Sequence, residues 1–266
     1  DGQTVTITLN SNTYTANVSS NSATVTISSG GLQGLTDGQT YTLTADVTNS
    51  AGNAATQVTS SSFVVDVTAP SINAIGTSAF SWGDRLNALE DDNDGTVTVT
   101  TVGVEDGQQV TITLNSNTYT ANVSSNSVTI TISASDLQAL TNGQSYTMTA
   151  DVSDAAGNAA TQVISSSFAV DVTAPSINAI GTSAFSWGAV LNSVEDNNNG
   201  TVTVTTVGVE DGQTVTITLN SNTYTANVSS NSATVTISAS DLQALTNGQS
   251  YTMTADVSDA AGNAAT

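Results

Sequence analysis

Cysteine and histidine are absent from this chain, and Arg85 is its only basic residue. The lack of cysteine excludes disulfide bonds and thiolate metal sites, and the lack of histidine and lysine removes the bases on which nucleophilic triads depend. Pairs of carboxylates can hydrolyse glycosides, but here the acidic residues recur at loop ends without an aromatic-lined cleft beside them. We therefore predict that the protein is not an enzyme.

The chain also has no apolar run near the ~20 residues of a membrane-spanning helix. No basic stretch followed by an apolar one forms a signal peptide in it. Its 22 acidic residues face one basic residue, which gives a net charge of −21. Nucleic acids and anionic lipid surfaces are bound through basic side chains, so we predict no nucleic-acid binding and no membrane insertion. The acidic surface lacks compensating positive charge, so the partner that it predicts is a cation.

An internal repeat organises the residues that are present. A segment that starts Asp-Gly-Gln and continues, one residue later, with Val-Thr-Ile-Thr-Leu-Asn-Ser-Asn begins at Asp1, Asp106 and Asp211, which sets a period of 105 residues. A unit of this length matches a complete β-sandwich domain rather than one turn of a solenoid. Thr, Ser, Asn, Val and Ala dominate the composition, which suits strands with one buried and one hydrated face.

Alternation of apolar residues with polar ones, mostly threonine, predicts the strands of a repeat. About seven strands follow per period, so the predicted fold class is all-β, with tandem immunoglobulin-like β-sandwich modules. The alternation slips in phase before Val102 and Val104, which predicts a bulge or bend there. The inward positions of the middle repeat are Val97 and Val99, then Val110, Ile112 and Leu114, then Tyr119, Ala121 and Val123, then Val128, Ile130 and Ile132, and last Tyr146, Met148, Ala150 and Val152.

One short helical turn interrupts this pattern. Residues 135–137, Ser-Asp-Leu, predict a turn capped by Ser135, with Leu137 and Leu140 packed beneath the sandwich. No helix longer than a turn or two is expected.

The sequence Asp-Val-Thr-Ala-Pro serves as the predicted linker and contains the only two prolines, Pro70 and Pro175. Each proline fixes its own φ and favours an extended alanine before it, so we expect short, fairly stiff linkers. The predicted modules are residues 1–66, which lack the first strands, residues 67–171, which are complete, and residues 172–266, which lack the last strand. We expect the chain to be a window from a longer array that begins and ends within modules.

Several motifs in these repeats are shared with a known family. They are the Asp-Val-Thr-Ala-Pro linker, the acidic loop from Asn87 to Glu90, the Val-Glu-Asp-Gly-Gln loop, the Leu-Gln-Ala-Leu-Thr-Asn-Gly-Gln turn, and Thr-Ala-Asp-Val-Ser-Asp-Ala-Ala-Gly-Asn. Over its whole length the chain resembles the bacterial Ig-like repeats that form the extender regions of RTX-type adhesins and related giant biofilm and ice-binding adhesins. The resemblance implies an extracellular protein of the bacterial cell surface, whose modules bind calcium at and near the linkers. It also implies that the stiffened chain projects a terminal binding domain away from the cell. Tyr146 stands where such a sandwich has a tyrosine corner.

The acidic loops independently suggest a divalent cation. Close carboxylate pairs repel by roughly 1–4 kcal/mol at surface-like dielectric constants, and one arginine cannot neutralise them. Calcium can, because it takes about 6–8 oxygen ligands from carboxylates, amides and carbonyls. In an immunoglobulin-like sandwich, the entering linker shares one end with the second-to-third and sixth-to-seventh strand loops, so we expect one acidic group at that end and another at the opposite end. The candidate ligands are Asp66, Glu105, Asp106, Asp151, Asp154 and Asn158 at the entering end, Glu90, Asp92, Asp94, Asp136 and Asp171 at the opposite end, and Glu195, Glu210, Asp211, Asp256 and Asp259 in the next repeat.

A simpler interpretation of the same residues stays open. Asp and Asn are frequent in β-turns, where they cap backbone groups and tolerate unusual angles, and an acidic surface keeps a secreted protein soluble. The second acidic loop, residues 195–199, carries two amides where the first carries carboxylates. We therefore expect a weaker site there, or one with fewer ions.

Function is predicted from these features together. The first hypothesis is a spacer segment of a secreted or cell-surface adhesin, stiffened by calcium and partnered by adjacent repeats of the same chain. The alternative is an extracellular filament subunit whose incomplete terminal modules pair between chains by strand complementation. A third hypothesis, direct ligand binding, would need exposed aromatic platforms, whereas we expect Trp82 and Trp187 to pack against the cores.

Overall fold

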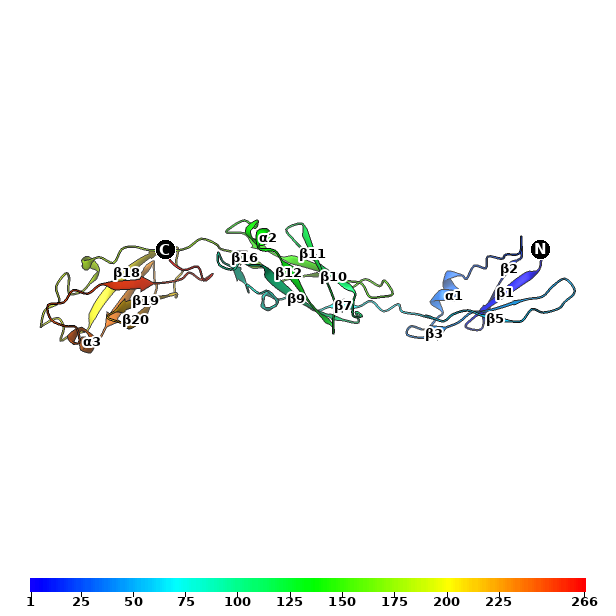
Figure 1. Ribbon diagram of the computed structural model, residues 1–266, viewed down its shortest axis with the longest axis horizontal. Helices are drawn as coiled ribbons and strands as arrows, with labels where there is room; N and C mark the ends of the chain where they lie inside the picture. Colours follow the sequence, from blue (N-terminus) through cyan, green and yellow to red (C-terminus); the bar gives the residue numbers. More distant parts are fainter.

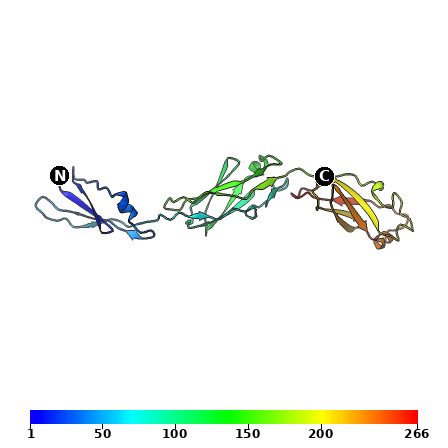
Figure 2. The same ribbon diagram turned by 180° about the vertical axis from the view of Figure 1, so that it is seen from behind.

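The computed structural model describes all 266 residues as three β-rich lobes arranged in a row and joined by extended segments (Figure 1). We refer to them by their predicted bounds as module 1 (residues 1–66), module 2 (67–171) and module 3 (172–266). Seen from behind, the N-terminus lies in the lobe at one end of the row, and the C-terminus lies where the third lobe faces the middle one (Figure 2). The all-β prediction is confirmed, because each helix has five residues or fewer.

Module 2 contains one core of 22 buried residues, built from three sheets. One sheet has the strand order β11-β10-β14-β15, a second has β12-β9-β7, and a third has β13-β16-β8. The elements in chain order are β7 (Ser71–Ile72), η1 (Thr77–Ala79), β8 (Arg85–Leu86), β9 (Gly95–Val102), β10 (Gln109–Leu114), β11 (Asn117–Asn122), β12 (Ser127–Ile132), α2 (Ala134–Gln138), β13 (Ser145–Tyr146), β14 (Met148–Asp151), β15 (Val163–Ile164) and β16 (Phe168–Val170).

Alternation places most of the predicted inward residues in this core, because successive side chains of a strand point to opposite faces of its sheet. Tyr119, Ala121 and Tyr146 are partly buried and pack against the core. In β10 the predicted positions Val110, Ile112 and Leu114 are all fully buried. Trp82 is also buried, stacked on Phe80 with ring centroids 5.3 Å apart. The expectation that this tryptophan packs in the core is therefore confirmed.

Module 3 repeats this arrangement around a smaller core of 12 buried residues. Its sheets have the orders β20-β19-β22 and β17-β18-β21. The elements are β17 (Ser176–Ile177), η2 (Thr182–Ala184), β18 (Gly200–Val207), β19 (Thr214–Leu219), β20 (Asn222–Asn227), β21 (Ser232–Ile237), α3 (Ala239–Gln243) and β22 (Met253–Asp256).

Module 1 has a four-stranded sheet, β2-β1-β4-β5, and a two-stranded one, β3-β6. Its elements are β1 (Thr4–Leu9), β2 (Asn12–Asn17), α1 (Ser29–Gln33), β3 (Thr40–Tyr41), β4 (Thr44–Val47), β5 (Val58–Thr59) and β6 (Phe63–Val64).

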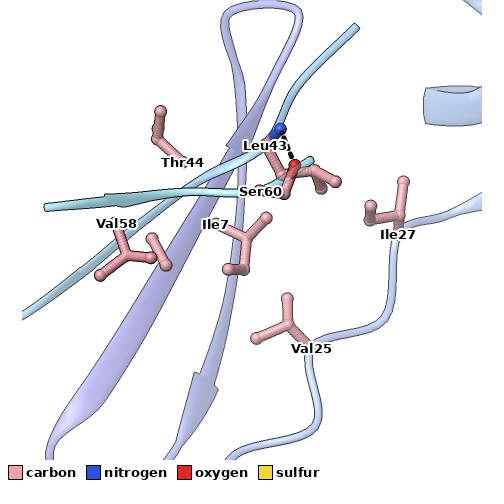
Figure 3. A pocket seen from close by; sticks show the side chains of 8 residues that line it. Ile7, Val25, Ile27, Leu43, Thr44, Val58 and Ser60 are labelled. Atoms are coloured by element: carbon pink, nitrogen blue, oxygen red, sulfur yellow. Dashed lines mark hydrogen bonds between the residues drawn. The ribbon is translucent and has the colours of Figure 1, made fainter. Parts of the chain in front are cut away.

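An apolar groove of about 300 Å³ opens on one face of module 1 (Figure 3). Ile7, Val25, Ile27 and Leu43 line it and are only partly buried. Their counterparts one repeat later, Ile112, Ile130, Ile132 and Met148, are at most 1% exposed in the core of module 2, where β9 pairs beside β12.

Two details of the strand and turn predictions differ in position from the structure. Strand β9 continues without a bulge through Val102, with Thr101 in the inward position and Val102 57% exposed. The chain bends one residue later, at Gly103, whose φ of 75° suits glycine, and Val104 is buried again.

The helical turn is confirmed but its cap is not Ser135. Helix α2 begins after Ser133, whose Oγ accepts a hydrogen bond from the Asp136 N–H at 3.3 Å. Leu137 and Leu140 are buried beneath it as predicted.

The tyrosine corner is present. The hydroxyl of Tyr146 accepts a hydrogen bond from the Thr141 N–H at 2.9 Å, which ties the start of the strand to the turn before it. The chain has no helix with the length and apolar character needed to cross a bilayer.

Candidate metal site at the module joints

Four of the predicted ligands meet at the end of module 2 that the first linker enters. The Asn158 side-chain N–H groups contact the Asp66 carbonyl at 3.2 Å and the Asp154 carboxylate at 2.9 Å. The Glu105 carboxylate accepts from the Ala155 N–H at 2.9 Å, which brings it to the same loop. The predicted grouping of Asp66, Glu105, Asp154 and Asn158 at one end therefore exists.

Asp154 is the most enclosed carboxylate of this group, with 3% of its surface exposed. Burial by itself raises the pKa of Asp154, but hydrogen bonds from the Asn158 side chain and from the backbone of Asn158, Gly157 and Ala156 outweigh it and lower the pKa. The carboxylate is thus held in its charged form by neutral donors within its own loop.

Asp106 and Asp151 bond elsewhere, contrary to the expectation that they join this group. The Asp106 carboxylate accepts from the Ser125 N–H at 2.7 Å, in the turn between β11 and β12. Asp151 lies on β14, and both of its oxygens accept from the Gln162 side chain. The physical reason is local: each carboxylate accepts from a donor that the conformation of its own turn or strand pair brings close, and this conformation cannot be read from the sequence pattern.

At the opposite end of module 2, the acidic loop lies against helix α2. The Asp94 carboxylate accepts from the Ala134 N–H at 2.9 Å, and Asp92 accepts from the Gln138 side chain at 2.8 Å. Asp136 accepts from Ser133 and from Asn117. Burial and the neighbouring Asp92 raise the pKa of Asp91 in this loop. Glu90 bonds within the loop itself, to the Asn87 N–H at 3.1 Å.

The entering group is repeated where the second linker meets module 3. Asp259 is 4% exposed and accepts from both the backbone and the side chain of Asn263. The Asn263 side chain donates to the Asp171 carbonyl at 2.8 Å, and Glu210 accepts from the Ala260 N–H at 2.8 Å. Asn263 was missing from the predicted ligands, although its place 105 residues after Asn158 could have identified it.

The remaining candidates lie apart from this group. Asp211 accepts from the Ser230 N–H at 2.7 Å, Glu195 accepts from the Asn192 N–H at 3.0 Å, and Asp256 lies on β22 opposite Thr216.

Sequence reasoning also missed a turn residue that contacts each linker. The Asn142 side chain accepts from the Val172 N–H at 3.0 Å and donates to the Thr173 hydroxyl at 2.6 Å. Asp37 takes the same place in module 1 and accepts from the Val67 N–H at 2.9 Å and from the Thr68 hydroxyl. These hydrogen bonds fix each linker to the module that precedes it.

The donor chemistry of the entering groups fits calcium. Carboxylate and carbonyl oxygens lie there around an asparagine side chain, whose nitrogen contacts them. Carboxylate, carbonyl and amide oxygens are the ligands that calcium prefers. The oxygens of the entering groups accept hydrogen bonds from amide groups of the protein, however. Nowhere do three acidic side chains form a group that could hold a metal ion. Bound calcium ions would supply positive charge to these acidic loops. The residues that would hold them are Asp66, Glu105, Asp154 and Asn158 at the first joint, and Asp171, Glu210, Asp259 and Asn263 at the second.

The model of the bacterial Ig-like domain (group 3) family matches residues 132–266, half of the chain. The chain belongs to this family. Bacterial Ig-like domains of this kind are structural modules, in agreement with the prediction that the protein is not an enzyme. None of the curated proteins matches the sequence.

Three of the solved structures that are similar to this chain come from bacterial adhesins. A structure from a 1.5-MDa bacterial ice-binding adhesin is 27% identical, covers 98% of this chain and 82% of that chain, and has a TM-score of 0.45. A Ca²⁺-stabilized adhesin of an Antarctic bacterium that binds ice is 30% identical over 99% of this chain and 63% of that chain, with a TM-score of 0.43. A bacterial immunoglobulin-like domain from the M. primoryensis ice-binding adhesin is 30% identical over 38% of this chain and 95% of that domain, with a TM-score of 0.28.

Proposed function

We propose that this chain is a spacer segment of a bacterial cell-surface adhesin, in which bacterial Ig-like modules hold a distant binding domain away from the cell. The observation that carries the proposal is that the second linker is bonded on both sides. The Asp171 N–H donates to the Leu86 carbonyl of module 2 at 2.9 Å, and the Asp171 carbonyl accepts from Asn263 of module 3 at 2.8 Å. A linker held by both neighbours transmits direction along the row, as a spacer requires.

Calcium at the entering groups is the second part of the proposal. A net charge of −21 with one basic residue leaves the acidic loops without protein cations. Extracellular calcium modules bind with dissociation constants of about 10⁻⁴–10⁻³ M. At an assumed ~10 mM calcium, each such site would add about 1.4–2.7 kcal/mol to the free energy of unfolding.

Thermal melting with calcium and with EDTA tests the ion. We expect the melting temperature to fall on chelation in the wild type and to change little in the double variant Asp154→Asn, Asp259→Asn. The matched control is Asp151→Asn, Asp256→Asn, which removes the same charge outside the entering groups and should keep the calcium response. Equal melting temperatures of the wild type in calcium and in EDTA would refute the calcium part.

Small-angle scattering tests the spacer itself. An extended row of modules predicts a maximum dimension several times the width of one module, whereas freely jointed modules would give a broad, shorter distribution. A compact particle in calcium would contradict the spacer role.

One observation favours the alternative of a filament subunit. The groove of module 1 is lined by apolar side chains whose counterparts are covered in module 2 (Figure 3). A strand like β9 would cover them, and strand complementation would take that strand from another chain. Size-exclusion chromatography across a concentration series separates the two functions. Oligomers that grow with concentration and that a synthetic Gly95–Val102 peptide dissociates would support the filament. A single monomeric species would support the spacer.

A further inference from the structure

The joint between modules 2 and 3 contains a direct interface in addition to the linker. The two sides are the loop that starts at Asn87 and the turn that ends at Asn263. The Ala88 N–H donates to the Asn263 Oδ1 at 2.9 Å, and the Asn87 Nδ2 donates to the Ala261 carbonyl at 2.9 Å. The C-terminal segment that carries this turn comes back to the middle lobe in both views (Figures 1 and 2).

Asn263 is built into module 3 before it meets its neighbour. It is 6% exposed, and Asp259 accepts from its backbone N–H at 2.8 Å and from its side chain at 2.9 Å. Its second amide hydrogen reaches the Asp171 carbonyl, and its oxygen takes the Ala88 N–H. One amide therefore bonds its own loop, the linker and the preceding module, which an aspartate could not do because it has no donor.

Gly262 lets the two loops approach. Its φ of 96° is a backbone angle that residues other than glycine rarely adopt. A Cβ at this position would lie 3.3 Å from the Asn87 Nδ2. The same glycine in module 2, Gly157, has no atom of a neighbour within 4 Å. The close contact is thus a property of the joint rather than of the turn.

The Asn87 loop is shaped by its own residues. The Asn87 Oδ1 accepts from the Leu89 and Glu90 N–H groups, both at 3.0 Å. In module 3 the Asn192 Oδ1 accepts in the same way from the Val194 and Glu195 N–H groups at 2.9 and 3.1 Å, although no module within residues 1–266 packs against that loop. The geometry that receives the neighbour therefore forms without it, which lowers the ordering cost of docking.

We propose that the Asn87 loop is a docking site for the Asp-x-x-x-Asn turn (residues 259–263) of the following repeat, and that this latch orients adjacent modules without a metal ion. The partner is the next bacterial Ig-like module, recognised through its asparagine amide and an alanine carbonyl. The proposal goes beyond the calcium-dependent spacer, since it assigns part of the stiffness to protein contacts alone.

The absence of cysteine allows a clean test, because labels attach only where cysteines are introduced. Thr118 and Thr223 are exposed equivalents on β11 and β20, so the pair Thr118→Cys, Thr223→Cys carries two spin labels across the joint. Double electron–electron resonance in EDTA then reports the distribution of distances between modules 2 and 3.

The deciding variant is Asn87→Asp, which keeps the acceptor for the Leu89 and Glu90 N–H groups but loses the donor to Ala261. Its control is Asn192→Asp, the same change in the loop that no module contacts. We expect a narrow distribution in the wild type and in the control, and a broad one in Asn87→Asp and in Asn263→Asp, with circular dichroism confirming that each variant is folded.

A broad wild-type distribution in EDTA, an equal broadening in Asn192→Asp, or an unchanged distribution in either Asn87→Asp or folded Asn263→Asp would overturn the latch. The outcome is independent of the calcium proposal. If calcium leaves the melting temperature unchanged while Asn87→Asp alone broadens the distribution, the ion is refuted and the latch is supported.

Discussion

The ring of Trp82 occupies the space where a side chain on Gly95 would begin. A Cβ at position 95 would lie 2.5 Å from the Trp82 Cζ3 and 2.9 Å from the Leu137 Cδ1, which is closer than real Cβ contacts allow. The first residue of β9 must therefore be glycine for the indole to stack in the core. Gly200 and Trp187 stand in the same relationship one repeat later.

Replacing Gly95 by alanine should destabilise module 2 by about 1–3 kcal/mol, because the added methyl group overpacks a rigid aromatic ring. Chemical denaturation followed by tryptophan fluorescence measures this loss. Gly76→Ala, also in module 2, is the control: a Cβ on Gly76 meets only the Ser78 Oγ, at 3.7 Å, which is ordinary van der Waals contact. Equal destabilisation by both substitutions would contradict the packing explanation.

Ser133→Ala should cost about 0.5–2 kcal/mol, because it removes the oxygen that caps helix α2. Ser135→Ala tests the cap that the sequence suggested and should cost less, since Ser135 only bonds the Ser133 hydroxyl at 2.9 Å. Urea titration of both variants compares the two costs. A larger loss for Ser135→Ala would place the cap at Ser135 after all.

Tyr146→Phe should destabilise module 2 by about 0.5–1.5 kcal/mol, because the Thr141 N–H loses its acceptor. Hydrogen exchange at the Thr141 amide should accelerate in the variant, while amides in β9 that lie away from the turn keep their protection. Unchanged exchange at Thr141 would show that the tyrosine corner does not hold this turn.

The two linkers should respond differently to acid. Hydrogen bonds from the Thr68 hydroxyl and the Val67 N–H lower the pKa of Asp37. A carboxyl whose folded pKa is lowered stabilises the fold above its unfolded pKa, about 3.9, and loses that contribution as the pH falls through the folded value. The first linker should therefore loosen below about pH 4, whereas Asn142 holds the second linker without a titrating group.

Amide exchange at Val67 and Val172 between pH 5 and pH 2, corrected for the intrinsic pH dependence of exchange, measures this difference. Protection at Val67 should fall with acid, and protection at Val172 should not. Asp37→Asn, which copies the residue of the second repeat, should remove the acid response of Val67. A response that persists in this variant would assign the effect to another carboxyl group.

Much of the fold followed from local pattern. The inward positions of β10 and β12 were predicted because strict alternation with threonine leaves one way to bury the apolar face. The slip in phase was predicted one residue too early, because β9 continues through Val102 with Thr101 in the inward position. Only the pairing of Ser71 with Val102 shows that the strand continues that far. The cap at Ser133 was missed because one serine stands just before the helix and another, Ser135, within its first turn, and only the backbone geometry shows which of them is the cap.

The sequence by itself determined the repeat, the β-sandwich class and the chemistry available to the acidic loops, because periodicity and composition are properties of the chain alone. Only the tertiary structure decided how those loops are used. Asp154 accepts a hydrogen bond from Asn158, while Asp151 accepts one from Gln162. The Asn263 amide forms hydrogen bonds to the linker and to module 2. Loop conformation sets the first two partnerships, and module orientation sets the third, which joins groups far apart in the sequence. No local sequence pattern encodes either of these.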